Sequence, residues 1–579
     1  MTVIRLLNSV HKNTKPSLRA FLLRMNDIKQ HIRNLVTIPP SSTPTHASSS
    51  SSSSSHFTML SQLPFRICQE QLSNASPFED LVLYPKGRSN DDKNSEVNAA
   101  FETAIQELNK LQPNEQTIRR SVENPKINTV KDTVKYLERS GLPLNVVEQL
   151  SFIHVSGTKG KGSTCALVES ILRQYGARTG FFSSPHVLAT NERIRIDGEP
   201  LAKQKFVNYF WPVYKRLMAK RENETDMPAY FKFLTILSFH VFVEENVDVA
   251  VMEVGIGGEQ DCTNVLRNVR TVGITSLGLE HTELLGNTME QIAWQKAGII
   301  KPYSHVYTHV TQPECLKVIR DRALEKQATV HEVPAFEQYF KHNLYEDYWP
   351  TFNEVIRLNG SLAIQLAYDW LRQTPSTLHR RYPINEPRMC DEVFLGLRNC
   401  HWPGRCQLVQ FQGMRLHLDG AHTKESMRVC TDWFWKSTSD SNNPKILIFN
   451  RTGDSDPMPM LKMLSEKCTF DMICFVPNVA TVKGINPNQV MIRSSAEVQL
   501  KRAHAIARSW DEMCNATNQI NNSRVYSTVY DAFSAIRERF SINNHELDVL
   551  ITGSIHLLGA TIAALNEFHI KAIPVNGHQ

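Results

Sequence analysis

A glycine-rich segment at residues 157–163 has the residue types that bind phosphate. It reads Gly157-Thr158-Lys159-Gly160-Lys161-Gly162-Ser163. Glycines let backbone N–H groups approach an anion, and the Lys161 ammonium suits the β- and γ-phosphates of a nucleotide. The spacing departs from the common P-loop, because Val155 replaces a first glycine and Gly162 separates Lys161 from the Ser163 hydroxyl. The segment predicts a nucleotide site, with a tight turn that binds nothing as the alternative.

The flanking residues predict that this segment joins a strand to a helix. Residues 152–155 form a short apolar run before it. Residues 163–175 follow it, and Leu167, Ile171 and Leu172 keep the spacing of a helix. A helix start beside a glycine loop presents N–H groups and the positive end of the helix dipole to an anion. This context favours phosphate binding over a simple turn.

Three polar residues stand where further strands are expected to end. Ser184, Glu253 and His281 each end or follow an apolar, strand-like run. These runs are residues 180–183, 247–254 and 272–276. A hydroxyl, a carboxylate and an imidazole beside a phosphate loop suit Mg²⁺, which takes few protein ligands and keeps phosphate oxygens and waters. Individually the three have ordinary alternatives, namely a turn residue, a surface ion pair and a helix cap.

The alternation of strand-like and helical stretches predicts an α/β fold with two domains. The first set of strands forms a P-loop-containing, doubly wound parallel sheet, whose ligand crevice lies past the carboxyl ends of the strands. A second set begins after the Pro-rich stretch 374–388 and predicts a smaller Rossmann-like α/β domain. The expected divisions are a leader with a Ser-rich linker (1–58), a poorly ordered lead-in (59–98), a nucleotide-binding domain (99–389) and a C-terminal domain (390–579).

Composition excludes several classes of protein. The 579 residues exceed one ordinary domain, and 41% hydrophobic with 21% charged residues is typical of a globular chain. No apolar stretch reaches the roughly 20 residues that a bilayer requires. A net charge of +6 gives no indication of nucleic-acid binding. The eleven cysteines form no Cys-x-x-Cys pair, which indicates reduced thiols inside the cell. We expect small-molecule substrates and a monomer.

The first residues predict import into mitochondria. The first 26 contain no Asp or Glu but carry five Lys or Arg among apolar side chains, which is typical of a transit peptide. The alternative is a disordered basic tail. Residues 48–55 are a serine run that suits a linker, and Met25 or Met59 could start shorter products. We therefore expect a mitochondrial form, in the matrix or at the inner membrane, and a cytoplasmic form.

The order of motifs along the chain resembles the folylpolyglutamate synthase family of the Mur ligase superfamily. The resemblance runs from about residue 99 to residue 565. In the first half it rests on residues 154–165 (HVSGTKGKGSTC), 181–186 (FFSSPH), 192–194 (ERI), 227–231 (MPAYF), 253–264 (EVGIGGEQDCTN), 281–286 (HTELLG) and 294–299 (WQKAGI). In the second half it rests on residues 402–405 (WPGR), 418–422 (LDGAH), 449–454 (FNRTGD) and 552–557 (TGSIHL).

This resemblance implies an ATP-dependent ligase. Members of the family phosphorylate the γ-carboxylate of a tetrahydrofolate or its polyglutamate, and the amine of L-glutamate attacks the acyl phosphate, which retains folates for one-carbon metabolism. The resemblance implies nucleotide binding by Gly157 to Ser163, Arg405 and Asp419, Mg²⁺ binding by Ser184, Glu253 and His281, and catalytic positions for Lys161, Lys296 and His422. It also makes K⁺ a candidate cofactor. Lys296 matches a lysine that is carbamylated in bacterial relatives, with an ordinary lysine at a helix end as the alternative.

Three positions depart from the family pattern. Glu280 stands where Asp is common, Arg451 where a small residue is usual, and Gly360 where Ala is expected. None belongs to the expected phosphate or metal set. Two other functions stay open: a dihydrofolate synthase, which adds the first glutamate to a pteroate, and a nucleotide-binding protein without ligase activity. The second of these predicts losses from the phosphate and metal set, and the sequence shows none.

Overall fold

The computed structural model describes most of the chain after residue 90. The described ranges are 91–112, 129–341, 345–374, 386–452, 456–481, 495–518, 520–540 and 546–571. All of them lie in one compact unit, residues 80–579. The predicted leader at residues 1–58 lies outside the described ranges, as do most of the 59–98 lead-in and most of the stretch 374–388.

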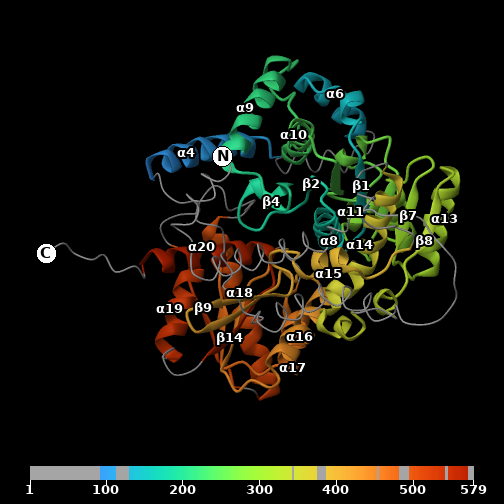
Figure 1. The fold of residues 1–579 in the computed structure, drawn as a ribbon. Helices are drawn as coiled ribbons and strands as arrows, with labels where there is room; N and C mark the ends of the chain where they lie inside the picture. Colours follow the sequence, from blue (N-terminus) through green and yellow to red (C-terminus); the bar gives the residue numbers. More distant parts are fainter. Residues whose placement is uncertain are drawn as a thin grey trace, which may run out of the picture. The chain divides into compact units, whose positions relative to one another are not determined.

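The first sheet is built around the strand that precedes the glycine-rich segment. Its order is β4-β3-β2-β5-β1-β6-β7-β8, so β1 lies between β5 and β6. The strands of this sheet labelled in Figure 1, β4, β2, β1, β7 and β8, follow this order across the view. The strands are β1 (Phe152–Ser156), β2 (Thr179–Phe182), β3 (Ile194–Ile196), β4 (Glu199–Pro200), β5 (Val249–Glu253), β6 (Thr271–Ile274), β7 (His305–Thr308) and β8 (Thr329–Glu332). All pair in parallel except β3 and β4, which add an antiparallel edge. Because β1 and β5 are buried along their whole length, their sequences are mainly apolar.

Helices cover both faces of this sheet. They are α4 (Asp91–Lys110), α6 (Thr129–Ser140), α7 (Leu144–Val147), α8 (Lys161–Gln174), α9 (Lys203–Ala219), α10 (Tyr230–Glu244), α11 (Thr282–Leu285), α12 (Met289–Ala297), α13 (Pro313–Glu325), α14 (Glu354–Gln373) and α15 (Asp391–Arg398). Short 3-10 helices are η1 (Thr190–Arg193), η2 (Cys262–Val265), η3 (Phe336–Phe340) and η4 (Glu346–Thr351). The helix after the glycine-rich segment, α8, packs on the sheet and is covered by α14 and α15. Within the described ranges, no helix has the length and hydropathy needed to cross a membrane.

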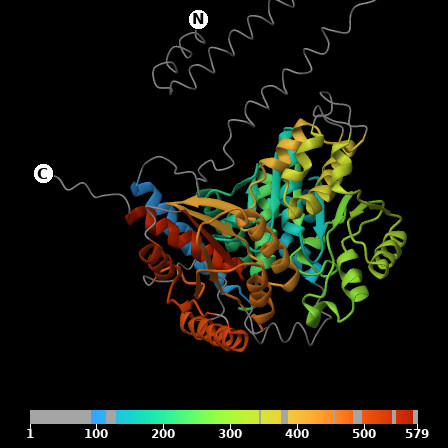
Figure 2. The ribbon, with the colours of Figure 1, turned by 90° about the horizontal axis from the view of Figure 1, so that it is seen from below.

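A second sheet follows, with the order β13-β12-β11-β14-β10-β9 (Figure 2, orange to red). Its elements are β9 (Gln407–Phe411), β10 (Met414–Leu418), α16 (Lys424–Thr438), β11 (Lys445–Phe449), α17 (Met458–Lys467), β12 (Met472–Phe475), α18 (Ala496–Thr517), β13 (Ser523–Val525), α19 (Val529–Phe540), β14 (Leu547–Thr552) and α20 (Ile555–Lys571). The strands are parallel except β9, which pairs antiparallel with β10. Alternate residues of β11 enter two cores, Ile446 and Ile448 on one face and Leu447 and Phe449 on the other.

The predicted α/β fold with two successive mainly parallel sheets is confirmed. Two details differ. The helix after the glycine-rich segment begins at Lys161, two residues before the predicted start at Ser163. Each sheet also carries antiparallel edge strands that the sequence did not predict. These strands are short or partly exposed, so they lack the continuous apolar run that marks β5.

Candidate functional site

The phosphate loop, residues 157–163, requires glycine at two positions for reasons of conformation and space. Gly157 and Gly160 have φ of +143° and +91°, which other residues rarely adopt. A Cβ on Gly157 would lie 1.8 Å from the Thr275 Oγ1, and a Cβ on Gly160 would lie 2.2 Å from the Asn359 Oδ1. The loop therefore passes close to β6 and α14, and both neighbours fix its path.

Hydrogen bonds attach the beginning of the loop to the segment after β6. The N–H groups of Thr158 and Lys159 donate to the carbonyl oxygen of Ser276, at 2.8 and 3.2 Å. The Thr158 hydroxyl donates to the Gly278 carbonyl and accepts from the Gly278 N–H, both at 3.1 Å. The N–H groups of the first turn of α8 have no partner within the helix, because a helix starts with free donors. Those donors, from Lys161 onward, are the ones the loop offers to an anion.

Two lysines point their ammonium groups at one carbonyl in the loop. The Nζ atoms of Lys161 and Lys296 lie 3.0 and 2.8 Å from the Gly157 carbonyl oxygen. Lys296 is only 3% exposed. Burial, together with the charges of Lys161 and Lys159, lowers the pKa of Lys296 to about 7. Near neutral pH the Lys296 amine is therefore partly unprotonated and able to act as a nucleophile.

Two of the three predicted metal ligands meet beside the loop. Glu253, at the end of β5, is 4% exposed and accepts a 2.9 Å hydrogen bond from the Ser184 N–H. Burial raises the pKa of Glu253, and the nearby Lys161 charge opposes that rise. A Cβ on Gly162 would lie 3.0 Å from Trp402 and 3.2 Å from a Glu253 carboxylate oxygen. The unusual extra glycine of the loop therefore makes room for this carboxylate.

The third predicted ligand, His281, lies at the end of the segment that joins β6 to α11. It caps α11 with φ of +52°. Partial burial lowers its pKa, as do the nearby charges of Lys161 and Lys296, against the effect of Glu280. No hydrogen bond or ion pair joins His281 to Ser184 or Glu253 in the described part of the chain, and the described residues contain no cluster of three His, Cys, Asp or Glu able to hold a metal. A hydroxyl after β2, a carboxylate at the end of β5 and an imidazole in the segment after β6 still match the types of donor that Mg²⁺ accepts.

The second sheet contributes Arg405 and Asp419. Asp419, which follows β10, is buried and accepts hydrogen bonds from the N–H groups of Cys406 and Ala421, at 2.8 and 2.9 Å. Burial raises the pKa of Asp419, and the Arg405 charge opposes that rise. The Arg405 charge also acts on Glu253 of the first sheet. The guanidinium therefore lies near carboxylates from both sheets.

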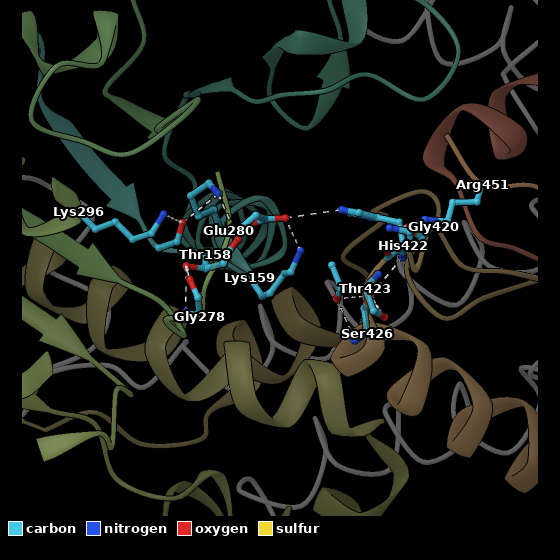
Figure 3. Close-up of polar contacts among 12 residues, drawn as sticks. Thr158, Lys159, Gly278, Glu280, Lys296, Gly420, His422, Thr423, Ser426 and Arg451 are labelled. Carbon is cyan, nitrogen blue, oxygen red and sulfur yellow. Dashed lines mark hydrogen bonds and ion pairs between the residues drawn. The ribbon is translucent and has the colours of Figure 1, made fainter. Parts of the chain in front are cut away.

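His422 follows Asp419 in the same loop and faces the first sheet. Its Nε2 lies 3.7 Å from the Oε1 of Glu280, and the same oxygen accepts a 2.7 Å hydrogen bond from the Lys159 Nζ (Figure 3). The Arg451 Nη1 donates to the His422 carbonyl oxygen at 2.8 Å. Sequence reasoning treated Glu280 and Arg451 only as departures from a pattern. Glu280 directly precedes His281, and that position was the available signal for its place in the site.

The geometry can be set beside known proteins. Residues 155–351 match the family model described as Mur ligase middle domain. The chain is 42% identical over 407 residues to the mitochondrial folylpolyglutamate synthase of Cricetulus griseus, covering 66% of this chain and 69% of that protein. It is 35% identical over 480 residues to a putative folylpolyglutamate synthase of Caenorhabditis elegans, covering 80% and 92%. The structure of Mycobacterium tuberculosis folylpolyglutamate synthase complexed with ADP aligns with a TM-score of 0.61 and 20% identity over 81% of this chain and 99% of that one, which is a similarity of fold.

Proposed function

The chain belongs to the folylpolyglutamate synthase family, and from this we propose that it joins L-glutamate to the γ-carboxylate of tetrahydrofolate and its polyglutamates, with hydrolysis of ATP. The observation that supports this proposal best is the arrangement around the phosphate loop. The charges of Lys161 and Arg405 both act on buried Glu253, and the three residues come from three segments and two sheets. Such an arrangement suits the binding of a nucleoside triphosphate together with a divalent cation better than the binding of a single small anion.

The reaction chemistry explains why such a site is needed. A carboxylate is a poor acyl donor, so ATP first converts it into an acyl phosphate, and the glutamate amine then displaces phosphate. The N–H groups at the start of α8 hold the nucleotide phosphates, and the Lys161 ammonium stabilises charge that develops on the transferred phosphoryl group. Ser184, Glu253 and His281 would hold Mg²⁺, whose charge neutralises the phosphate oxygens. Glu253 fits this role because it is a buried carboxylate with a raised pKa, a state that a cation would relieve.

Lys296 is the proposed carbamylation site. Carbamylation joins the neutral amine to CO₂ through a new N–C bond and releases a proton to solvent, so the side chain that was a cation when protonated becomes an anion. The pKa of about 7, lowered mainly by burial and further by Lys161 and Lys159, makes the neutral amine available. The repulsion from these two lysines would become attraction after the reaction. The product carboxylate would face the phosphate loop, where a second cation such as K⁺ or Mg²⁺ could be held.

The segments around β9 and β10 complete the proposed site. Arg405 and Asp419 contact the nucleotide, and His422 lies toward the reacting groups. Since hydrolysis of the acyl phosphate would waste ATP, the nucleotide-binding domain (99–389) and the C-terminal domain (390–579) close over it and exclude water. The chain acts as a monomer on small molecules. It functions in mitochondria, as several relatives' names state for those proteins, and products that start at Met25 or Met59 supply a cytoplasmic form.

The decisive test supplies the purified protein with MgATP, L-glutamate and either tetrahydrofolate or dihydropteroate. We expect glutamylated tetrahydrofolate by mass spectrometry, with one ADP released per glutamate added. Product from dihydropteroate alone would replace the proposal with a dihydrofolate synthase. ATP binding without any ligated product would indicate the nucleotide-binding protein that lacks ligase activity.

A further inference from the structure

One carboxylate oxygen in the site lies between the side chains of Lys159 and His422, which come from different parts of the fold. The Glu280 Oε1 lies 2.7 Å from the Lys159 Nζ and 3.7 Å from the His422 Nε2 (Figure 3). Glu280 belongs to the segment between β6 and α11, Lys159 to the phosphate loop, and His422 to the loop after β10. The three side chains are 24%, 33% and 49% exposed, so they can move. Glu280 therefore connects the phosphate loop to the second sheet.

The His422 end of this connection is held in place by its own loop. The His422 Nδ1 lies 3.2 Å from the Gly420 carbonyl oxygen, and the His422 N–H donates to the Ser426 Oγ at 3.2 Å. Arg451 holds the His422 carbonyl, as described above. Ser426 also completes the capping box that starts α16. These contacts orient the ring so that Nε2 is directed at Glu280.

The Lys159 end is the one that a nucleotide would disturb. Of the three lysines near the loop, Lys161 and Lys296 point at the Gly157 carbonyl, whereas Lys159 is the one in an ion pair within the described ranges. Its backbone is fixed on Ser276, but its long side chain can rotate. Phosphate oxygens arriving at the loop would compete with Glu280 for the Lys159 ammonium. The phosphate oxygens would also place negative charge beside the Glu280 carboxylate, unless another side chain pairs with that carboxylate.

We propose that Glu280 is a positioning residue that exchanges Lys159 for His422 when nucleotide binds, and so couples phosphate binding at the loop to docking of the loop after β10. The inference rests on the proposed function, because it requires a nucleotide at the loop. Before nucleotide binds, Glu280 holds Lys159 away from the phosphate position. After Lys159 turns to the phosphates, the His422 Nε2 closes on the carboxylate and brings the second sheet's loop toward the first.

The test is a double-mutant cycle on nucleotide affinity. A nonhydrolysable ATP analogue with Mg²⁺ is titrated calorimetrically into the full-length protein and into Glu280→Gln, His422→Gln and the double variant. Glu280→Gln should bind about 2- to 5-fold more tightly, the range expected for a partly exposed ion pair, because Lys159 is released. His422→Gln should bind the analogue about 2-fold more weakly, because Glu280 then has Lys159 as its one partner in this trio and holds it more firmly. In the Glu280→Gln background, the His422 change should have no effect.

Turnover supplies the second readout. Glu280→Gln should lower kcat while it tightens nucleotide binding, because the second sheet's loop is no longer drawn in; a merely structural loss would weaken both. Glu283→Gln is the matched control, since it also replaces a carboxylate by an amide, at an exposed residue in the first turn of the adjacent α11. Equal tightening in the Glu280 and Glu283 variants, or equal effects of His422→Gln in both backgrounds, would overturn the inference. Failure of the unmodified protein to bind the analogue would instead overturn the proposed function and, with it, the inference.

Discussion

The extra glycine of the phosphate loop allows the sharpest prediction, for Gly162→Ala. Gly162 is the second residue of α8 and its backbone lies outside the left-handed region, so alanine fits the local conformation. The added Cβ would lie 3.0 Å from the Trp402 ring and 3.2 and 3.4 Å from the two Glu253 carboxylate oxygens. These distances are short, so Glu253 or Trp402 must shift by a few tenths of an ångström.

The effects on stability and activity should differ in size. Alanine gains up to about 1 kcal/mol over glycine inside a helix, and overpacking costs about 1–3 kcal/mol. The free energy of unfolding should therefore fall by no more than about 3 kcal/mol. A displaced catalytic group is less forgiving, since a misplacement of about 1 Å costs roughly 100-fold in rate. For a smaller shift of Glu253 we expect kcat/KM for ATP to fall about 10-fold, which corresponds to about 1.4 kcal/mol.

The assay is ADP release at saturating folate and glutamate, alongside urea unfolding. Gly278→Ala is the matched control, because the nearest atom to its added Cβ is the Thr158 Cγ2 at 3.9 Å. That variant should keep its activity. Unchanged activity of Gly162→Ala together with a gain in stability would refute the reasoning, because it would mean that the carboxylate does not depend on space at position 162.

Three further predictions concern charged residues. Lys161→Ala should lower kcat at least about 100-fold, measured as ADP release, because a preorganised contact to the transferred phosphoryl group is lost; a loss confined to KM would contradict that role. Lys296 has a pKa of about 7, so its amine is protonated below that pH and neutral above it. Peptide mass spectrometry in bicarbonate should therefore find more CO₂ adduct on Lys296 at pH 8 than at pH 6. The Lys296→Arg variant should show no adduct at this position. Asp419→Ala should lower the free energy of unfolding by about 2–4 kcal/mol in urea titrations, because the part-buried Cys406 N–H and the buried Ala421 N–H lose their acceptor. Asp419→Asn should lose less, because its side-chain oxygen can still accept one of these hydrogen bonds.

The sequence predicts the central strands well because burial on both faces leaves a continuous apolar run. The β5 segment Val249–Glu253 is such a strand, and it ends in the carboxylate that the sequence predicts as a metal ligand. Its contact with Ser184 follows from the parallel pairing of β2 and β5. The alternation of strands and helices predicts a parallel sheet, but it does not predict that these two strands are neighbours. By contrast, most of β8 is exposed and its sequence alternates weakly, so its residues, Thr329–Glu332, carry no comparable signal.

Contacts between distant segments could not be predicted in the same way. The Gly162 side of α8 meets Trp402, and Glu280 meets His422, across long stretches of chain. No periodicity relates such positions, because they depend on how the second sheet's loops lie against the first. The roles assigned to Arg405, Asp419 and His422 stay predictions, although the structure shows that each lies in a loop of the second sheet.

Two glycines of the phosphate loop, at positions 160 and 162, differ in whether a second substitution could make another residue acceptable there. Position 160 is locked by its own backbone, because φ of +91° excludes a side chain even if Asn359 became smaller. Position 162 is limited only by its neighbours, Trp402 and Glu253, so a smaller residue at 402 would relieve the tightest contact of alanine and leave it room to move away from Glu253. We expect substitutions at 162 and 402 to appear together in descendants of this sequence, whereas position 160 has no compensating partner and should stay glycine.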